Sequence, residues 1–303
     1  MQKKLGMPSF DPKKLTIPEI HGILLGSVNP RPIALASGVN EEGVPNLSPF
    51  SYFNVFSANP PILIFSPARR AKNNTTKHTF ENAKIHPEVV VNIVSYDIVQ
   101  QMSLSSTEYP EGVNEFKKSG LTPIPSEVVK PPRVKESPVQ YECKVNEIVE
   151  LGQEGGAGNL IICEVVRIHV NDELIDENFK IDQTKIDTVG RMGGNYYVRA
   201  NGQALFEVAK PLRTLGIGVD NIPEDIKNSS ILTGNDLGQL GNVEEMPNET
   251  DVNDYRLIEL GDLFVELEDE PHELEKSLHR KAHDLLLDGK VNEAWLTLLS
   301  FNN

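Results

Sequence analysis

The chain is poor in cysteine, in long apolar runs and in positive charge, and each shortage excludes a class of protein. Its two cysteines, Cys143 and Cys163, form no CxxC pair and lie in apolar segments, so we expect buried free thiols and neither a metal site nor a disulfide. No apolar run reaches the roughly 18–20 residues that a membrane helix needs. The N-terminal lysines precede no apolar stretch, so we expect no secretory signal and a cytoplasmic protein.

Negative charge exceeds positive charge, and the excess is concentrated near the C-terminus. The chain has 29 Lys and Arg against 44 Asp and Glu, a formal net charge of −15. Residues 211–303 contain 20 acidic and 7 basic residues and therefore carry −13 of that total. Nucleic acids and anionic membranes bind cationic surfaces, so neither is an expected partner. A solvated acidic face is the default interpretation of this segment.

Strand and turn signals dominate the chain before residue 211. Asn40-Glu41-Glu42-Gly43 predicts a hairpin turn, because Asn tolerates the left-handed conformation and Gly adopts it without steric cost. Helix signals are few: residues 73–76 offer N-caps for a helix over 80–85, and 114–118 is typical of one helical turn. Many short strands with Gly and Pro turns favour a barrel or a sandwich. The predicted strands are 32–39, an edge or irregular strand from residue 44 onward marked by Pro45 and Pro49, 62–65, 89–94, 139–150 and 159–170.

After residue 210 the apolar spacing becomes helical. Apolar residues recur every three or four positions over 273–288, Gly289 follows as a C-cap, and a second stripe covers 291–299. This pattern predicts an αα-hairpin. We therefore divide the chain into a β-rich domain, 1–210, and an acidic, largely helical extension, 211–303.

Two motifs resemble sites but have simpler interpretations. The glycine-rich segment 152–158 contains neither GxGxxG nor GxxxxGK[ST], so we expect a hairpin loop and no phosphate loop, and no Rossmann unit is visible. His279 and His283 have metal-ligand spacing on a predicted helix, with His272 nearby, but the glutamate of HExxH is missing. We therefore interpret these histidines as surface residues.

The segment 31–79 has the residue types of a site for a planar, phosphorylated ligand. Residues 46–51 place small hydroxyls beside a proline and an aromatic, which lets a flat ring approach backbone groups. The following strand ends in SPARR (66–70), and residues 74–79 are rich in hydroxyls, amides and positive charge. Such a helix start suits a phosphate. The alternative is an irregular edge strand followed by an ordinary capped helix, and the residues alone slightly favour it.

The same segment resembles the signature region of the flavin reductase-like, FMN-binding split-barrel family. The matching motifs, in order, are RPIA, the turn ending at Gly43, GVPNLSPFSYF, NPP, and SPARR followed by KHT; residues 190–197 resemble a later GR–GG–YY element. The resemblance covers about residues 15–210. It implies a mainly β fold, an antiparallel Greek-key split β-barrel with peripheral helices. Residues 211–246 resemble an extension of some larger members, and 247–303 are expected to be helical.

The resemblance also implies which residues hold the flavin. Along the segment, the first residues would contact the flavin ring, with backbone groups at the ring edges. The next would contact the ribityl chain, and the last would contact the phosphate. An arginine late in the chain would reach FMN or the substrate pocket. Arg70 is an alternative to Arg69. Because hydride transfer needs no general acid or base, we name no catalytic residue. The implied residues are Asn46, Ser48, Pro49, Phe50 and Ser51 for the ring, Ser66 and Arg69 for the ribityl chain and phosphate, Lys77 and Thr79 for the phosphate, and Arg191.

The implied function is NAD(P)H-dependent reduction of flavin or a related small acceptor by a homodimer with flavin near the subunit interface. FMN would supply the redox chemistry, and the protein would bind and tune it. The alternative is a flavoredoxin-type electron carrier that serves a redox partner protein without oxidising NAD(P)H directly. The acidic extension fits three roles, as a docking site for a basic redox partner, a lid over the flavin or a solubilising segment, and the sequence does not separate them.

Overall fold

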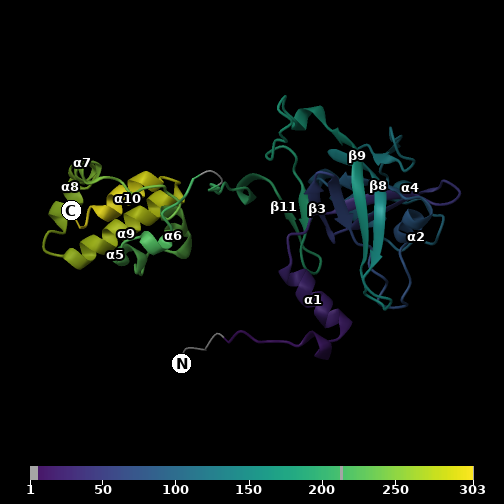
Figure 1. Ribbon diagram of the computed structural model, residues 1–303, viewed down its shortest axis with the longest axis horizontal. Coiled ribbons are helices and arrows are strands. Elements are labelled where there is room, and N and C mark those ends of the chain that lie inside the picture. The colour runs from purple at the N-terminus through teal and green to yellow at the C-terminus, as the bar shows by residue number, and fades with distance from the viewer. Residues whose placement is uncertain (1–5, 212–213, 303) are drawn as a thin grey trace. The chain divides into compact units, whose positions relative to one another are not determined.

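The computed structural model describes residues 6–211 and 214–302 of the protein (Figure 1). The chain divides into two compact units, Met1–Phe206 and Glu207–Asn303. Each unit has hydrophobic clusters of its own, built around residues such as Phe65 in the first unit and Trp295 in the second.

A seven-stranded antiparallel sheet with the order β2-β1-β5-β8-β9-β4-β3 forms the first unit. The edge strands β2 and β3 are joined by only Ser51 and Tyr52, a link that spans at most about 11 Å. The two edges therefore meet, and the sheet curls into a barrel, which confirms the predicted antiparallel barrel. The strands are β1 (Ala34–Val39), β2 (Pro45–Phe50), β3 (Phe53–Ala58), β4 (Pro61–Phe65), β5 (Glu88–Ile93), β8 (Val139–Glu150) and β9 (Asn159–Val170).

Most strands lie where the sequence predicts them. The long hairpin β8–β9 pairs Val139 with Val170 and Glu150 with Asn159, and the segment 152–158 is its loop, as expected (Figure 1). The turn at residues 40–43 also forms, with Gly43 at a φ of 76°. Cys143 and Cys163 are buried free thiols, as predicted, and burial raises the pKa of the Cys143 thiol to about 12.

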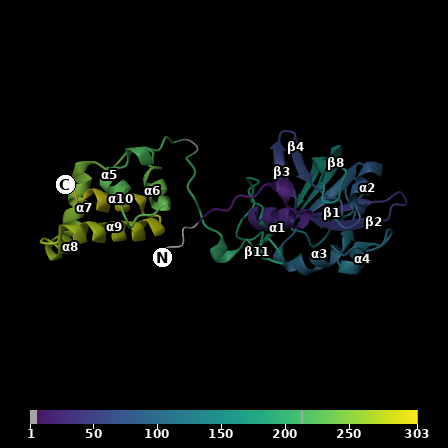
Figure 2. The same cartoon turned by 90° about the horizontal axis from the view of Figure 1, so that it is seen from below.

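Helices and short strands surround this barrel. α2 packs against β1 and β2 (Figure 2). Its N-cap is Lys77, so the prediction that residues 73–76 cap this helix was wrong. Residue 73 ends a turn instead, and residues 74–76 form no regular element, with Asn74 at a φ of 54°. The elements are α1 (Ile17–Ser27), α2 (His78–Ile85), α3 (Val99–Ser105), α4 (Glu115–Ser119) and the two-stranded pairs β6 (Pro123–Ile124) with β7 (Arg133–Val134) and β10 (Val189–Arg191) with β11 (Tyr197–Arg199).

The second unit is helical, and its last two helices confirm the predicted hairpin. Gly289, at a φ of 74°, ends α9 before α10 begins. Trp295 is fully buried in the core of this unit, and its indole N–H donates to the Leu240 carbonyl at 3.1 Å. The helices are α5 (Glu224–Lys227), α6 (Gly234–Leu240), α7 (Glu249–Glu259), α8 (Gly261–Glu266), α9 (Pro271–Leu287) and α10 (Val291–Leu299).

The prediction that the α9 histidines lie on the surface was wrong for His279. Its side chain is buried, and Nδ1 lies 2.7 Å from the Ser229 hydroxyl. Burial lowers the pKa of His279, so the ring is a neutral core group. His283 Nδ1 lies 2.9 Å from Oδ2 of Asp236.

Within residues 6–211 and 214–302, no group of three His, Cys, Asp or Glu is arranged to hold a metal ion. No helix in these ranges combines the length and the apolar character needed to cross a bilayer.

Candidate functional site

A buried polar network ties β2 to the helices that flank it. The Thr79 hydroxyl donates to Asn46 Oδ1 at 2.8 Å, and Asn46 Nδ2 donates to Glu115 Oε1 at 3.1 Å. The second oxygen of Glu115 accepts the Leu47 N–H at 3.0 Å. Burial raises the pKa of Glu115, while the bonds from Leu47 and Asn46 oppose that shift. The network therefore fixes the start of α2, strand β2 and α4 relative to one another.

Beside this network, two cations converge on a single carboxylate oxygen. Lys77 Nζ and Arg70 Nε each lie 2.8 Å from Oε1 of Glu108. These two hydrogen bonds, with Lys77 the larger influence, hold the pKa of the Glu108 carboxyl down at about 2. Arg70 also donates to the Thr75 hydroxyl at 3.0 Å and to the Thr76 carbonyl. The structure thus holds a pair of positive charges at the N-terminal end of α2.

These groups line a small recess between β2, the start of α2 and the segment that links α3 to α4. With Glu108 in place its volume is about 20 Å³, close to the minimum for one water molecule. Hydroxyl, amide and cationic groups are the donors that an anion needs. The lining residues are Asn46, Ser48, Arg70, Lys77, His78, Thr79, Ser106, Thr107, Glu108, Tyr109 and Glu115.

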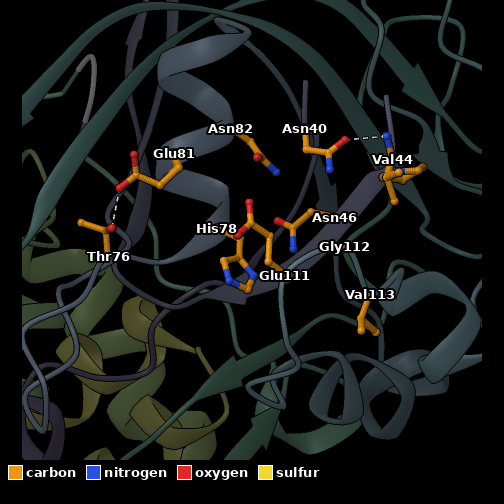
Figure 3. Close-up of a pocket in the computed structure, with 11 residues that line it drawn as sticks. Asn40, Val44, Asn46, Thr76, His78, Glu81, Asn82, Glu111, Gly112 and Val113 are labelled. Carbon is orange, nitrogen blue, oxygen red and sulfur yellow. Dashed lines mark hydrogen bonds between the residues drawn. The ribbon is translucent and has the colours of Figure 1, made fainter. Parts of the chain in front are cut away.

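A larger recess of about 130 Å³ adjoins it and shares Asn46 and His78 with it (Figure 3). The Thr76 hydroxyl donates to Glu81 at its rim, and Asn40 accepts the Val44 N–H at 2.8 Å. The two recesses together follow β2 from its first residue to Ser48. The remaining lining residues of the larger recess are Pro45, Asn82, Glu111, Gly112 and Val113.

Four of the sequence-predicted site residues line the smaller recess: Asn46, Ser48, Lys77 and Thr79. The side chains of Asn46 and Thr79 bond to each other, so they hold β2 against α2. Arg70 lines the recess as well.

The structure places the two neighbouring arginines differently. Arg69 is not among the lining residues; its guanidinium donates to the Asn74 side chain at 2.7 Å and to the Asn74 carbonyl. Its backbone bonds to Gly156 and Ala157 in the β8–β9 loop. Arg70, the alternative kept open by the sequence, is therefore the arginine of the recess.

The other predicted residues lie outside both recesses. Phe50 is buried, and its ring packs against Phe65 in the barrel core at a centroid distance of 5.4 Å. The Ser66 hydroxyl is buried and accepts the Asn159 N–H at 3.0 Å. Arg191 stacks over the Tyr197 ring at 4.6 Å. Pro49 and Ser51 are partly buried at the end of β2.

Sequence reasoning missed the segment that faces α2 across the recess. Ser106, Thr107, Glu108 and Tyr109 line the recess, and Glu115 follows at the start of α4. The available signal was a turn-rich stretch with three glutamates, TEYPEGVNE, which alone indicates an exposed loop.

Comparison with known proteins assigns the first unit to a family. The model of the flavin reductase like domain matches residues 25–187, more than half of the chain. The chain belongs to this family. The family predicted from the sequence motifs is therefore confirmed, and residues 207–303 lie outside the match.

Several solved structures resemble this family member. Nitrilotriacetate monooxygenase component B from Bacillus cereus is 34% identical with a TM-score of 0.63, and the match covers 67% of this chain and 99% of that one. The 2-nitrobenzoate 2-nitroreductase NbaA from Pseudomonas fluorescens is 28% identical with a TM-score of 0.60, covering 69% and 100%. A split-barrel protein from Shewanella frigidimarina is 28% identical with a TM-score of 0.57, covering 67% and 100%. These neighbours confirm the split-barrel fold.

One curated relative also matches this chain in sequence. An uncharacterised protein of Aquifex aeolicus (strain VF5) is 40% identical over 189 residues, which cover 62% of this chain and 94% of the relative. The matched residues of the flavin reductase-like protein therefore account for nearly all of that relative.

Proposed function

We propose that this protein binds FMN on its split barrel and uses NAD(P)H to reduce flavin or a related small acceptor. The observation that supports this most directly is the convergence of Lys77 and Arg70 on one oxygen of Glu108. A carboxylate oxygen is a chemical stand-in for a phosphate oxygen, because both are anionic acceptors of charge-assisted hydrogen bonds. The pair lies at the start of α2, where the helix dipole also favours an anion.

Strand β2 supports the placement of the ring. It is an edge strand that pairs with β1 alone, and its residues Pro45, Asn46 and Ser48 line the two recesses. Pro45 and Pro49 carry no N–H, and the Leu47 N–H is taken by Glu115, so this edge offers little to a further strand. Ser48 lies on the same strand beside the cationic pair.

These positions assign separate roles to the cofactor and to the protein. FMN held there would supply the redox chemistry, hydride acceptance from a nicotinamide and onward electron transfer. Arg70 and Lys77 hold the phosphate, and the Thr79–Asn46–Glu115 network keeps β2 in position beside it.

Two measurements test this function. The purified protein is expected to take up FMN saturably and to show a flavin absorption band. Mixed anaerobically with NADH or NADPH in a stopped-flow instrument, the bound flavin is expected to bleach rapidly. No bleaching by either nucleotide, together with reduction by a ferredoxin-like donor, would make the protein an electron carrier instead. A colourless protein with no saturable FMN uptake would remove the proposal altogether.

We also propose that the protein is a homodimer. The apolar helix α1 has no buried residue, and Ile17, Ile23 and Leu24 are each about half exposed. On the edge strand β3, Val55 and Phe56 are 64% and 63% exposed. Helix faces and edge strands of this kind are typically covered by another chain. A second copy of the same barrel is the occupant that we propose.

Substituting Phe56 with Glu is expected to convert the dimer to a monomer, because a carboxylate would be buried without a partner in the interface. Analytical ultracentrifugation or light scattering after size exclusion measures the change in mass. Ser230→Glu, at an exposed polar position, provides the charge-matched control. A wild-type monomer, or a Phe56→Glu protein that remains a dimer, would contradict this interface.

A further inference from the structure

Glu108 lies where it blocks the cations that the proposed flavin site needs. It belongs to the irregular link between α3 and α4, residues 106–114. Its Oε1 takes the hydrogen bonds of both Lys77 and Arg70 at 2.8 Å, while its side chain is 58% exposed. Of the described side chains, these two cations are its only ion-pair partners within 4 Å.

The remaining space is too small for a phosphate group beside this carboxylate. The recess measures about 20 Å³ with Glu108 in place, which is near the size of one water. A phosphate that reached Lys77 and Arg70 would therefore have to displace Glu108. A flavin phosphomonoester carries about −1.5 to −2 charges near neutral pH, against one for the carboxylate, so the phosphate has the stronger attraction to the pair.

Displacement would leave Arg70 in position. Arg70 keeps its bonds to the Thr75 hydroxyl and the Thr76 carbonyl, so its guanidinium does not depend on Glu108 for orientation. Glu108 would rotate into solvent from a side chain that is already more than half exposed. The link around it includes Gly112 at a φ of 79°, a turn and no regular element.

We propose that Glu108 is an internal anion that occupies the phosphate position of the flavin site and is displaced when FMN binds. The inference rests on the proposed function, because it assigns the phosphate of FMN to Lys77 and Arg70. Its consequence is selective: Glu108 weakens the binding of phosphorylated flavins and leaves riboflavin unaffected. FMN is then an exchangeable ligand, held less tightly than the two cations alone would hold it.

The carboxylate is charged throughout the range in which the protein would be assayed. Its two cationic partners hold its pKa at about 2, so protonation does not release it at mildly acidic pH. Substitution of Glu108 therefore removes the competing charge, whereas mildly acidic pH does not.

The test compares Glu108→Gln with wild type by titrating each with FMN and with riboflavin, following the quenching of flavin fluorescence. Glutamine keeps the shape and removes the charge. FMN is expected to bind about three- to tenfold more tightly to the variant, the range set by two partly exposed ion pairs. Riboflavin affinity is expected to stay unchanged. Glu147→Gln is the matched control, because Glu147 is an exposed acid of strand β8 that lines neither recess and forms no ion pair within 4 Å in the described part of the chain.

The outcomes separate the inference from the function on which it rests. If wild type binds FMN and Glu108→Gln binds it equally or more weakly, Glu108 is a structural ion-pair residue and the inference is overturned while the function stands. An equal gain for riboflavin also overturns it, since the effect would not concern the phosphate. If wild type takes up no FMN, the proposed function falls and the inference falls with it. A thermal melt of each variant establishes that all are folded.

Discussion

Substituting Lys77 with Ala is expected to weaken FMN binding about 10- to 100-fold, the loss that follows from removing a hydrogen bond to a charged group. Riboflavin binding is expected to remain close to wild type, because riboflavin has no phosphate for Lys77 to hold. The asymmetry between the two ligands is the essential result. It separates loss of an anchor from general damage to the site, which would weaken both ligands alike.

Two further variants make this experiment specific. Lys72→Ala removes an exposed lysine nearby that forms no ion pair within 4 Å among the described residues, so it controls for the change in net charge. Arg70→Ala is expected to reproduce the FMN-selective loss, because Arg70 shares the Glu108 oxygen with Lys77. Isothermal titration at two salt concentrations measures the affinities. Equal losses for FMN and riboflavin in Lys77→Ala would show that Lys77 is not the phosphate anchor.

The sequence predicted the strands well because their signals are local. β8 and β9 have the predicted bounds, 139–150 and 159–170, since two long β-prone runs flank a glycine-rich loop. Helix α1 was not predicted, although it is strongly apolar. None of its residues is buried in this chain, so its apolar residues do not form one buried face. An apolar stripe along one buried face is the pattern by which a helix is recognised in a sequence.

The site was only partly predictable, because its geometry depends on long-range contacts. Motif order located Lys77 and Asn46, but nothing local distinguishes Arg69 from its neighbour Arg70. The Arg69 guanidinium bonds to Asn74 and its backbone to the β8–β9 loop, while the Arg70 guanidinium bonds to Glu108, so contacts with segments distant in sequence separate the two. Glu115, 69 positions from Asn46, lies beyond the reach of local patterns for the same reason.

The histidine prediction failed through a related cause. Spacing places His279 and His283 one turn apart on α9, but it does not say which side of the helix is covered. The core of the second unit includes Leu286 and Ala282 from the same helix, and the Ser229 hydroxyl accommodates the polar ring of His279 in a buried position.

Substituting Leu240 with Ala is expected to cost the second unit about 2–5 kcal/mol of unfolding free energy, the range for truncating a fully buried leucine. Leu240 belongs to the core cluster around Trp295, and its carbonyl accepts the indole N–H. The chain has a single tryptophan, so its fluorescence reports on this unit alone. Urea titration followed at the tryptophan emission is expected to show a lower midpoint in the variant.

The same variant is expected to bind FMN as tightly as wild type, because every residue that lines the two recesses lies between Asn40 and Glu115. Leu257→Ala removes a leucine that is 75% exposed in the same unit and is expected to change its stability by no more than about 0.5 kcal/mol. Loss of FMN affinity in Leu240→Ala, in parallel with the tryptophan transition, would contradict this independence. It would mean that the acidic extension contributes to the flavin site, which favours a lid over a solubilising segment.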